Sequence, residues 1–506
     1  MSSSNSIVQA YIRQVGIDHV SNGTLAYLAS LSEVASVSPE VARSIVHELR
    51  DQRVRLKLIA SENYCSLPTQ LAMGNLLTDK YAEGFPRARF YEGCDNIDEI
   101  EACACEQAKR LFNCQHAYVQ PHSGADANLI AYWAILSARI EMPALEKWGV
   151  KTAAQLTDEQ WRELKHDLGN QRLLGMDLAS GGHLTHGYRF NVSAKMFDAY
   201  NYGVSHENYL LDYDVIEQKA LEVKPLILLA GYSSYPRAID FRRMRAIADK
   251  VGAVFMVDMA HFAGLVAGKV FQGDYDPVAH AHVVTSTTHK TLRGPRGGIV
   301  LCTKEFAEFV DKGCPLVIGG PLPHMLASKA VAFTEANTDA FRQYASRIVE
   351  NARTLAQACV DSGMKIVSGG TDNHLMLLDV TPFGITGRQA AGALFDCNIT
   401  LNKNAIPFDP NGPVTTSGLR IGTPAITTLG MGPDEMRDIA AIIRFVLDHT
   451  TPGIVDSGPS QGKTSKVKYE VEESALTEAR QRVAALLKRF TLYPELDLAL
   501  MEQHFA

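Results

Sequence analysis

The chain has 506 residues, of which 49 are lysine or arginine and 56 are aspartate or glutamate, giving a formal net charge of −7. This length exceeds the size at which one hydrophobic core stops growing, so we expect one large and one small domain. Because the balance is acidic and no run rich in lysine and arginine stands out, the composition argues against a nucleic-acid partner.

The nine cysteines are odd in number and lack the paired short spacings of a disulfide framework. They are typical of reduced thiols, so we expect a cytoplasmic location. The amino terminus shows no basic region followed by an apolar core. The most apolar stretch, residues 252–268, includes Asp258 and His261, so we expect neither a secretion signal nor a membrane span.

Residues 1–60 are expected to form an amino-terminal helical arm. Ser38 is a preferred N-cap residue and Pro39 suits the first helical position, and apolar residues then recur at helical spacing. Glycine and proline mark an irregular segment at 80–87, and irregular segments often carry functional residues.

Residues 61–335 are expected to form the large domain. Strand and helix patterns alternate from residue 116 to residue 302, which predicts an α/β fold with a mostly parallel sheet covered by helices on both faces. The short apolar runs at 253–257 and 282–284 are typical of buried strands. A charged insert at 140–171 is expected to be helical and peripheral.

Residues 336–506 are expected to form the smaller α+β domain. A strand is predicted at 375–379, with short strands around Ile399 and Leu419. The extended tail covers 450–506. Within it, residues 451–468 are rich in Gly, Ser, Pro and Lys, which predicts a loop or linker, and 472–490 is an amphipathic helix.

Two polar segments follow the buried strands at 253–257 and 282–284, and they contain Asp258 and Lys290. Open α/β sheets bind ligands at the carboxyl ends of their strands. A lysine amine that attacks an aldehyde forms a Schiff base, the anchor used by pyridoxal phosphate, and an aspartate can keep the ring nitrogen of that cofactor protonated. A lone lysine is usually a solvated charge and a lone aspartate a turn residue, but the pair indicates a site.

Two further features fit such a site. Ser123 and Gly124 lie between a strand and a helix, where free N–H groups and the helix dipole favour phosphate, although serine and glycine there are more often only a cap and a turn. Arg420 lies in a strand bounded by glycines and could grip an amino-acid carboxylate with two parallel hydrogen bonds.

With these residues in place, the chain resembles the serine hydroxymethyltransferases, which are pyridoxal-phosphate enzymes of fold type I. The resemblance covers about four fifths of the chain. It rests on LIASEN (58–63), KYAEGFP (80–86), QPHSGADAN (120–128), GGHLTHG (181–187), VDMAHFAGL (257–265), TTHKTLRGPRGG (287–298), SGGTDNHL (368–375) and SGLRIGTPA (417–425).

The resemblance implies roles for individual residues. The implied catalytic set is Lys290, Glu83, Asp258, His183, Tyr91 and Arg420. The implied cofactor-binding set adds Ser123, Gly124, Ser233, His261, His289, Tyr81, Gly319 and Gly320. The implied substrate and folate contacts are Ser61, Tyr91, Arg420, Leu178, Gly182, Leu184 and Asn404. No metal is implied.

The implied reaction is the reversible transfer of the hydroxymethyl group of serine to tetrahydrofolate, which gives glycine and 5,10-methylenetetrahydrofolate. Pyridoxal 5'-phosphate would be held as a Schiff base on Lys290, and Glu83 would act as a protonated acid. Because Tyr81, Gly319 and Gly320 match groups that reach the phosphate of another subunit, the resemblance implies a homodimer with shared active sites.

Departures from the family pattern leave alternatives open. Phe90 replaces a usual tyrosine, and Gly412-Pro413-Val414 replaces a stretch that usually ends in phenylalanine, both on the folate side. A folate-independent aldolase or racemase would keep Lys290, Asp258 and Arg420. A non-catalytic folate-binding scaffold would have lost these groups, and a dehydrogenase is disfavoured because no G-x-G-x-x-G follows the first strand.

Overall fold

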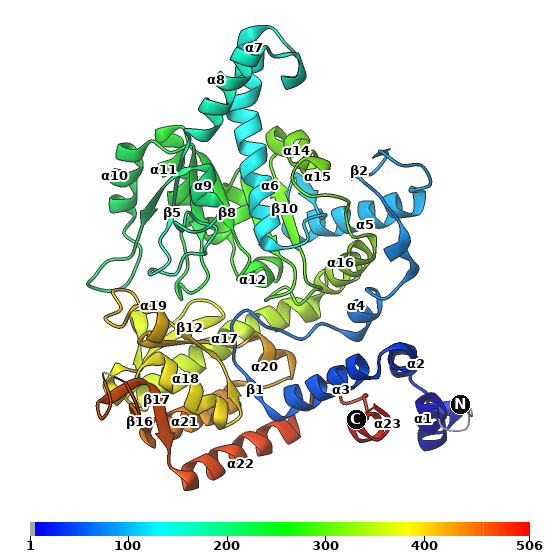
Figure 1. Ribbon diagram of the computed structural model, residues 1–506, viewed down its shortest axis with the longest axis vertical. Coiled ribbons are helices and arrows are strands. Elements are labelled where there is room, and N and C mark those ends of the chain that lie inside the picture. The colour runs from blue at the N-terminus through cyan, green and yellow to red at the C-terminus, as the bar shows by residue number, and fades with distance from the viewer. Residues whose placement is uncertain (1–5, 459, 506) are drawn as a thin grey trace.

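The computed structural model describes residues 6–458 and 460–505, and its largest element is a seven-stranded sheet (Figure 1). The spatial order is β4-β10-β9-β8-β7-β5-β6. β10 runs antiparallel to both of its neighbours, and the remaining pairs are parallel. The strands are β4 (His116–Tyr118), β5 (Arg172–Met176), β6 (Asp198–Tyr202), β7 (Ile227–Gly231), β8 (Val254–Asp258), β9 (Val283–Thr287) and β10 (Gly298–Cys302).

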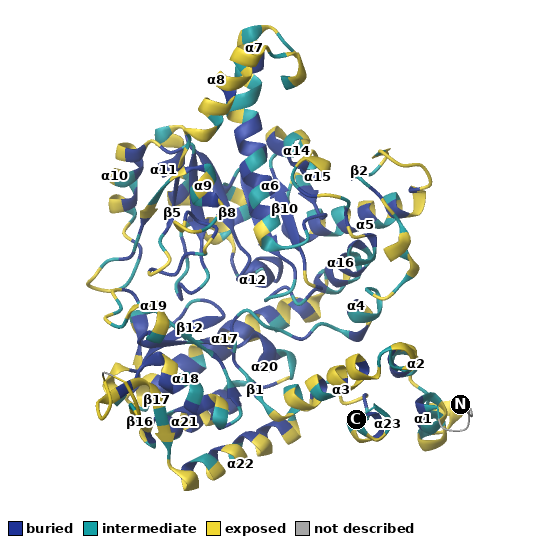
Figure 2. Cartoon of the chain, in the orientation of Figure 1, coloured by how far each residue is buried: buried dark blue, intermediate teal, exposed yellow. Residues whose placement is uncertain are grey.

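Alternate residues of β8 pack on opposite faces of the sheet, as a pleated strand requires. Val254 and Met256 join the core beneath α6 (Gly124–Leu136) and α14 (Lys304–Asp311). Phe255 and Val257 join the core beneath α5 (Asp95–Phe112) and α11 (Phe241–Val251). Figure 2 shows this sheet as the most deeply buried part of the upper body. The expected α/β fold, mostly parallel and covered on both faces, is confirmed.

A second, antiparallel sheet lies below the first in Figure 1, in the order β11-β12-β15-β14. Its strands are β11 (Lys365–Ile366), β12 (Leu375–Asp379), β14 (Asn402–Asn404) and β15 (Gly418–Gly422). Three helices pack with it into a separate hydrophobic core: α17 (Asp339–Asp361), α18 (Gly387–Asp396) and α21 (Pro433–Asp448). The strand expected at 375–379 is therefore β12.

From residue 6 on, the amino-terminal segment is helical as expected and forms α1 (Ile7–Val15), α2 (Asn22–Val37) and α3 (Pro39–Val54), whereas residues 1–5 of the predicted arm lie outside the described residues. The strand after α3, β1 (Leu56–Lys57), pairs with β13 (Ile399–Thr400) and ties the arm to the smaller sheet. The last helix, α23 (Leu498–Phe505), packs on α3, and Arg53 donates hydrogen bonds to three backbone carbonyls of residues 492–496. The two ends of the chain consequently share one small core.

The prediction of a loop over 451–468 is wrong. The chain forms a hairpin there from β16 (Thr450–Ile454) and β17 (Thr464–Val471). Tyr469 of this hairpin donates a 2.8 Å hydrogen bond to Asp396 and lies against Gly392 of α18. The Gly, Ser, Pro and Lys residues that suggested a loop are divided between the two strands and the turn that joins them, and contacts with α18 stabilise the strands.

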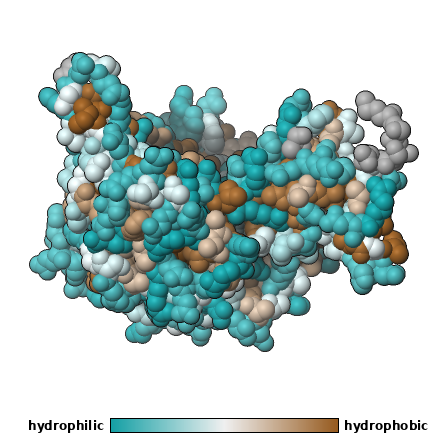
Figure 3. Space-filling view, turned by 90° about the horizontal axis from the view of Figure 1, so that it is seen from below, coloured by the Kyte–Doolittle hydropathy of each residue, from teal (hydrophilic) through white to brown (hydrophobic). Residues whose placement is uncertain are grey.

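The expected helical insert forms α7 (Met142–Trp148) and α8 (Asp158–Gly169), which project from the body at the top of Figure 1. The amphipathic helix expected at 472–490 is α22 (Glu473–Arg489). Among the described residues, no helix is both long enough and apolar enough to cross a membrane. Figure 3 shows the underside, where apolar residues form a band toward the end that carries the amino terminus.

We predict that Phe255→Ala lowers the free energy of unfolding by about 3–5 kcal/mol, because it leaves a cavity in the middle of the central sheet. Phe255 is fully buried. Phe190→Ala is the matched control: Phe190 is 81% exposed, so its removal should change stability by less than about 0.5 kcal/mol. Urea unfolding measures both, and equal effects would contradict the described core.

Candidate active site

Asp258 ends β8 and is buried with a complete set of hydrogen-bond donors. Its Oδ2 accepts from Asn128 Nδ2 at 2.9 Å and from His186 Nε2 at 3.2 Å, and its Oδ1 accepts from the Ala260 N–H at 3.0 Å. Burial by itself would raise the pKa of Asp258, but the hydrogen bonds from His186 and Asn128 and the nearby histidines outweigh it and hold the pKa well below its usual range. The carboxylate therefore stays charged inside the protein.

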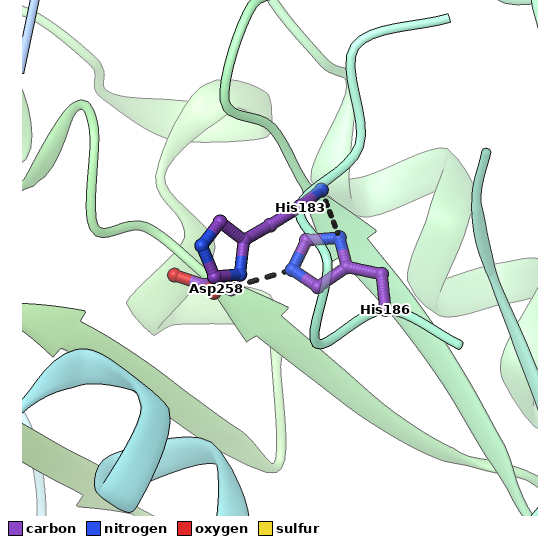
Figure 4. Close-up of side chains that lie close together, drawn as sticks. All are labelled: His183, His186 and Asp258. Atoms are coloured by element: carbon purple, nitrogen blue, oxygen red, sulfur yellow. Dashed lines mark hydrogen bonds and ion pairs between the residues drawn. The ribbon is translucent and has the colours of Figure 1, made fainter. Parts of the chain in front are cut away.

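The hydrogen bonds of His186 fix the position of its proton. Its Nδ1 accepts from the backbone N–H of His183 at 3.3 Å, so the neutral ring carries its proton on Nε2, which faces Asp258 (Figure 4). The possible ligand atoms of His183, His186 and Asp258 all lie within 4.8 Å of one another. Because both Nδ1 atoms already accept protein N–H groups, we interpret these side chains as a hydrogen-bond chain rather than a metal site.

The His183 ring lies beside Asp258, in the loop that follows β5 (Figure 4). Its Nδ1 accepts from the Thr185 N–H at 3.3 Å and lies 2.8 Å from Thr185 Oγ1. Burial lowers the pKa of His183 to about 4, although the Asp258 charge works in the opposite direction. A neutral, oriented imidazole is suited to stacking on an aromatic ring.

Lys290 follows β9 and lies close enough to Asp258 for their charges to interact. Burial lowers the pKa of the Lys290 amine to about 8, while Asp258 raises it and Arg420 lowers it further. The Lys290 backbone is fixed because its carbonyl accepts from Asn63 Nδ2 at 3.0 Å. An amine with this pKa is partly unprotonated near neutral pH and can act as a nucleophile.

The amino terminus of α6 offers an anion-binding site at the same edge of the sheet. Ser123 caps the helix by accepting from the Asp126 N–H, and within the described residues the N–H groups of Gly124 and Ala125 have no hydrogen-bond acceptor. A Cβ at Gly124 would lie 2.7 Å from Thr287 Cγ2, so glycine lets the helix end approach β9 closely. Free N–H groups and the helix dipole here favour a phosphate.

His289 lies next to Lys290, and its Nδ1 is buried without a hydrogen-bond partner in the part of the chain that the structure describes. Burial lowers the pKa of His289 to about 3, and the charges of Arg296 and Lys290 add to the effect. An unpartnered buried nitrogen beside the reactive amine is consistent with a place that a ligand completes.

Arg420 lies in β15 of the smaller sheet and reaches the larger sheet. Its guanidinium donates to the Ser233 carbonyl at 2.8 Å, to Ser233 Oγ at 3.1 Å and to Asn402 Oδ1 at 3.1 Å. Within the described ranges its hydrogen bonds go to Ser233 and Asn402 and none goes to an acidic side chain, and burial lowers its pKa to about 10. A buried cation without an acidic partner can receive the carboxylate of a bound amino acid. Ser61 lies nearby, since Ala60 packs against Gly422 of the same strand.

His261 follows Asp258 by three residues and is paired with a histidine that the sequence did not single out. His261 Nδ1 lies 3.1 Å from Nε2 of His374, at the start of β12. Both rings are buried, and burial lowers the pKa of each.

Of the predicted folate contacts, Leu178 lines a cavity of about 960 Å³ beside His183, whereas Gly182, Leu184 and Asn404 are not among its lining residues. Leu178 lines this cavity, and Leu184 is 43% exposed at the same loop. Gly182 lies in the same loop. A Cβ there would lie 2.1 Å from the Met176 carbonyl oxygen, so a glycine is needed for the loop to pack against the end of β5. Asn404 ends β14, and its Nδ2 donates to the carbonyl of Ala405, which lines the cavity.

Five other predicted residues form a second cluster. Tyr91 donates to Glu83 Oε2 at 3.4 Å, and its ring packs edge-on against Tyr81 at 5.2 Å between centroids. A Cβ at Gly320, which follows Gly319, would lie 3.2 Å from the Tyr81 ring. Within the described residues, no hydrogen bond links Tyr91 or Glu83 to Lys290 or Arg420, and the charges that shift the pKa of Lys290 are those of Asp258, Arg420 and Arg296 rather than Glu83.

Sequence reasoning missed the residues that orient the site. They are Asn128, Thr185, His186, His374 and Asn402. Four of these lie inside the motifs quoted above or next to a predicted residue, but nothing local distinguishes a polar side chain that orients the site from one that caps a turn. Thr285 adds a 2.5 Å hydrogen bond to Asn128 Oδ1, which fixes the amide that faces Asp258.

Comparison with known proteins agrees with this geometry. The family model described as serine hydroxymethyltransferase matches residues 34–149 and 165–443. A serine hydroxymethyltransferase from Treponema pallidum is 60% identical over 99% of this chain and 87% of its own length. The chain belongs to the serine hydroxymethyltransferase family.

Two further relatives with the same name span nearly the whole chain. The protein from Salinispora tropica is 56% identical over 94% of this chain and 98% of its own length. That from Chlamydia trachomatis serovar D is 50% identical over 97% of this chain and 99% of its own length. The family model skips 150–164, which lies in the projecting insert, and stops before β16.

We predict that the protein loses stability as the pH falls from about 6.5 toward 4 partly because of His183. Its pKa is about 4 in the folded chain, against about 6.5 when unfolded, so the unfolded chain binds more protons between these values. The urea concentration at the unfolding midpoint should therefore decrease when the pH is lowered from 7 to 5, and the decrease should be smaller in His183→Gln. An identical pH dependence in the variant would contradict the assignment.

Proposed function

We propose that this chain catalyses the reaction of its family, the reversible transfer of the serine hydroxymethyl group to tetrahydrofolate, giving glycine and 5,10-methylenetetrahydrofolate. The observation that carries the proposal is the Lys290 amine, which lies close enough to the charged Asp258 and to Arg420 for both charges to act on its pKa. One-carbon transfer and interconversion of serine and glycine follow from that reaction.

The residues present fit pyridoxal 5'-phosphate. Lys290 would hold its aldehyde carbon, Asp258 its protonated ring nitrogen, His183 one face of the ring, and the α6 terminus at Ser123 and Gly124 its phosphate. Bound there, the cofactor supplies an electron sink that lets a bond to the α-carbon of an amino acid break. Ser233 and His289 lie around the same place and would complete its contacts.

The substrate carboxylate would bind Arg420. Arg420 donates from Nε to Asn402 and from Nη1 to Ser233, and within the described residues this leaves Nη2 free for an incoming carboxylate. Burial strengthens this pairing because water competes poorly. Ser61 would lie beside the bound amino acid.

Tetrahydrofolate would enter through the cavity beside His183, lined in part by Leu178. Apolar walls with a few polar groups are typical of sites for ligands of this size. Tyrosine is absent at Phe90, so the folate contacts of this chain rest more on Leu178, Gly182, Leu184 and Asn404.

The cluster of Tyr81, Glu83 and Tyr91 would serve the site of a second copy of the chain. Within one chain these side chains contact each other rather than Lys290, and Glu83 is only partly buried, so it can approach a neighbouring molecule. Exposed apolar residues on the amino-terminal arm, Val37 at 86% and Val41 at 49%, are consistent with a homodimer contact. In the dimer, Glu83 would hold a proton near the serine hydroxyl.

All nine cysteines are free thiols, which supports a reducing compartment, and we propose the cytoplasm. The alternatives of a folate-independent aldolase or racemase remain side reactions of the same groups, because neither requires the folate cavity.

We predict that the purified protein cleaves serine and that tetrahydrofolate stimulates the reaction, since the cavity proposed for folate reaches His183, which lies beside Asp258. Lys290→Ala should abolish both turnover and the visible absorbance of the cofactor, because its anchor is lost. Formaldehyde or methylenetetrahydrofolate release and the absorbance spectrum measure these effects.

Lys304→Ala is the control, because Lys304 is exposed on α14 and its removal should change neither the spectrum nor turnover. A serine cleavage rate that is the same with and without tetrahydrofolate would favour the folate-independent aldolase. An unchanged absorbance spectrum in Lys290→Ala would contradict the role of Lys290 as the cofactor's anchor.

We predict that two inactive variants restore activity together when co-expressed. Lys290→Ala removes the amine of one site and Glu83→Gln removes the acid, and in a mixed dimer one site keeps both groups because they come from different chains. A mixture of Lys290→Ala with Asp258→Asn should stay inactive, because those two residues belong to the same chain's site. Failure of the first mixture, with mixed dimers present, would contradict the shared site.

A further inference from the structure

His261 and His374 form a hydrogen bond between the two sheets. His261 follows β8 of the large sheet, and His374 precedes β12 of the small one. Their ring centroids are 5.4 Å apart and the ring planes differ by 28°, whereas Nδ1 of His261 and Nε2 of His374 are only 3.1 Å apart. The two nitrogens therefore lie on facing ring edges, and one of them must carry the proton.

The surroundings decide which ring donates. If His261 donated, the proton of His374 would sit on its own Nδ1, which is buried without a hydrogen-bond partner in the described chain. Buried N–H groups without an acceptor are rarer in proteins than under-satisfied acceptors. If His374 donates from Nε2, its Nδ1 carries only a lone pair. Burial, together with the charges of Arg420 and Lys290, lowers the pKa of His374 to about 3, so a single proton is available on that ring.

We propose that His374 is a positioning residue that donates to His261 Nδ1 and so holds the remaining proton of His261 on Nε2, making His261 a hydrogen-bond donor to an oxygen anion in the active site. Within the described residues, His261 Nε2 has no hydrogen-bond partner of its own. The neighbouring cations Lys290 and Arg420 mark a place for an anion. The assignment of that anion rests on the proposed function: it is the cofactor's ring oxygen or the substrate carboxylate.

Both histidines are held firmly enough for this role. Asn373, next to His374, donates to the Tyr232 hydroxyl and the Tyr235 carbonyl at 3.0 Å each. The His374 carbonyl accepts from the Thr423 N–H at 3.0 Å, in the segment that follows Arg420. The His261 carbonyl accepts from Thr291 Oγ1 at 2.9 Å, just after Lys290. The pair is therefore fastened to both the lysine loop and the arginine strand.

The direct test is the tautomer of His261 in the full-length protein. Ring-labelled ¹⁵N-histidine distinguishes a protonated from an unprotonated ring nitrogen, and His261→Asn assigns the signal. We expect Nε2 to be protonated and Nδ1 to accept, with or without bound pyridoxal phosphate. A His261 ring that carries its proton on Nδ1 would overturn the proposal.

Two variants test the consequence for catalysis. His374→Gln keeps an N–H donor at the place of Nε2, so His261 should keep its tautomer and the enzyme should turn over serine near the normal rate. His374→Phe keeps a ring but loses the donor, so His261 should populate both tautomers and kcat/KM should fall roughly 10- to 100-fold, the scale typical of outer partners that orient a histidine. Equal loss in both variants would overturn the donor role.

Folding and function are controlled separately. Thermal unfolding shows whether His374→Phe is folded; if it is not, the tautomer in the native chain and in His374→Gln still decides the proposal. His280→Gln changes a partly exposed histidine on α13 (Pro277–His280), controls for the substitution and should leave the tautomer of His261 and turnover unchanged. If the native protein fails to cleave serine, the proposed function is wrong. The His261 tautomer is measured in the same sample, so the donor role of His374 is tested independently of that result.

Discussion

The rest of this site depends on a charged carboxylate kept inside the protein. An isolated carboxylate in a dry interior would be protonated, because burial disfavours the charged form. Asp258 stays charged because it accepts hydrogen bonds from three donors on separate elements: an amide from α6, an imidazole from the loop after β5 and a backbone N–H from its own turn. Meeting this requirement fixes how those elements pack around the end of β8.

The same arrangement determines the state of the groups nearby. Burial keeps His183 and His289 neutral, with pKa values near 4 for His183 and near 3 for His289. Burial also brings the pKa of the Lys290 amine down to about 8. A neutral imidazole, a charged carboxylate and a partly free amine thus coexist within one small volume, which is the combination that imine chemistry on an aromatic aldehyde requires.

The site lies between two sheets, and hydrogen bonds cross from one to the other. Arg420 in the small sheet donates to Ser233, which follows β7 in the large one, and His374 pairs with His261. Asn63, near the end of the arm, donates to the Lys290 carbonyl and to the Tyr344 hydroxyl on α17. The position of the amino-acid clamp relative to the reactive lysine therefore depends on how the two sheets pack.

The sequence by itself determined the alternation of helices with the buried strands of the large sheet, and it singled out Lys290, Asp258 and Arg420, because buried strands have a clear apolar pattern and reactive residues follow their ends. It did not find the edge strand β6, which is mostly exposed or partly buried. It misassigned 451–468, where contacts with α18 outweigh a loop-like composition. Only the tertiary structure decided the partners of these groups. His186 lies 72 residues from Asp258 and His374 lies 113 residues from His261, so the hydrogen bonds that set their charges and protons exist only once the chain is folded.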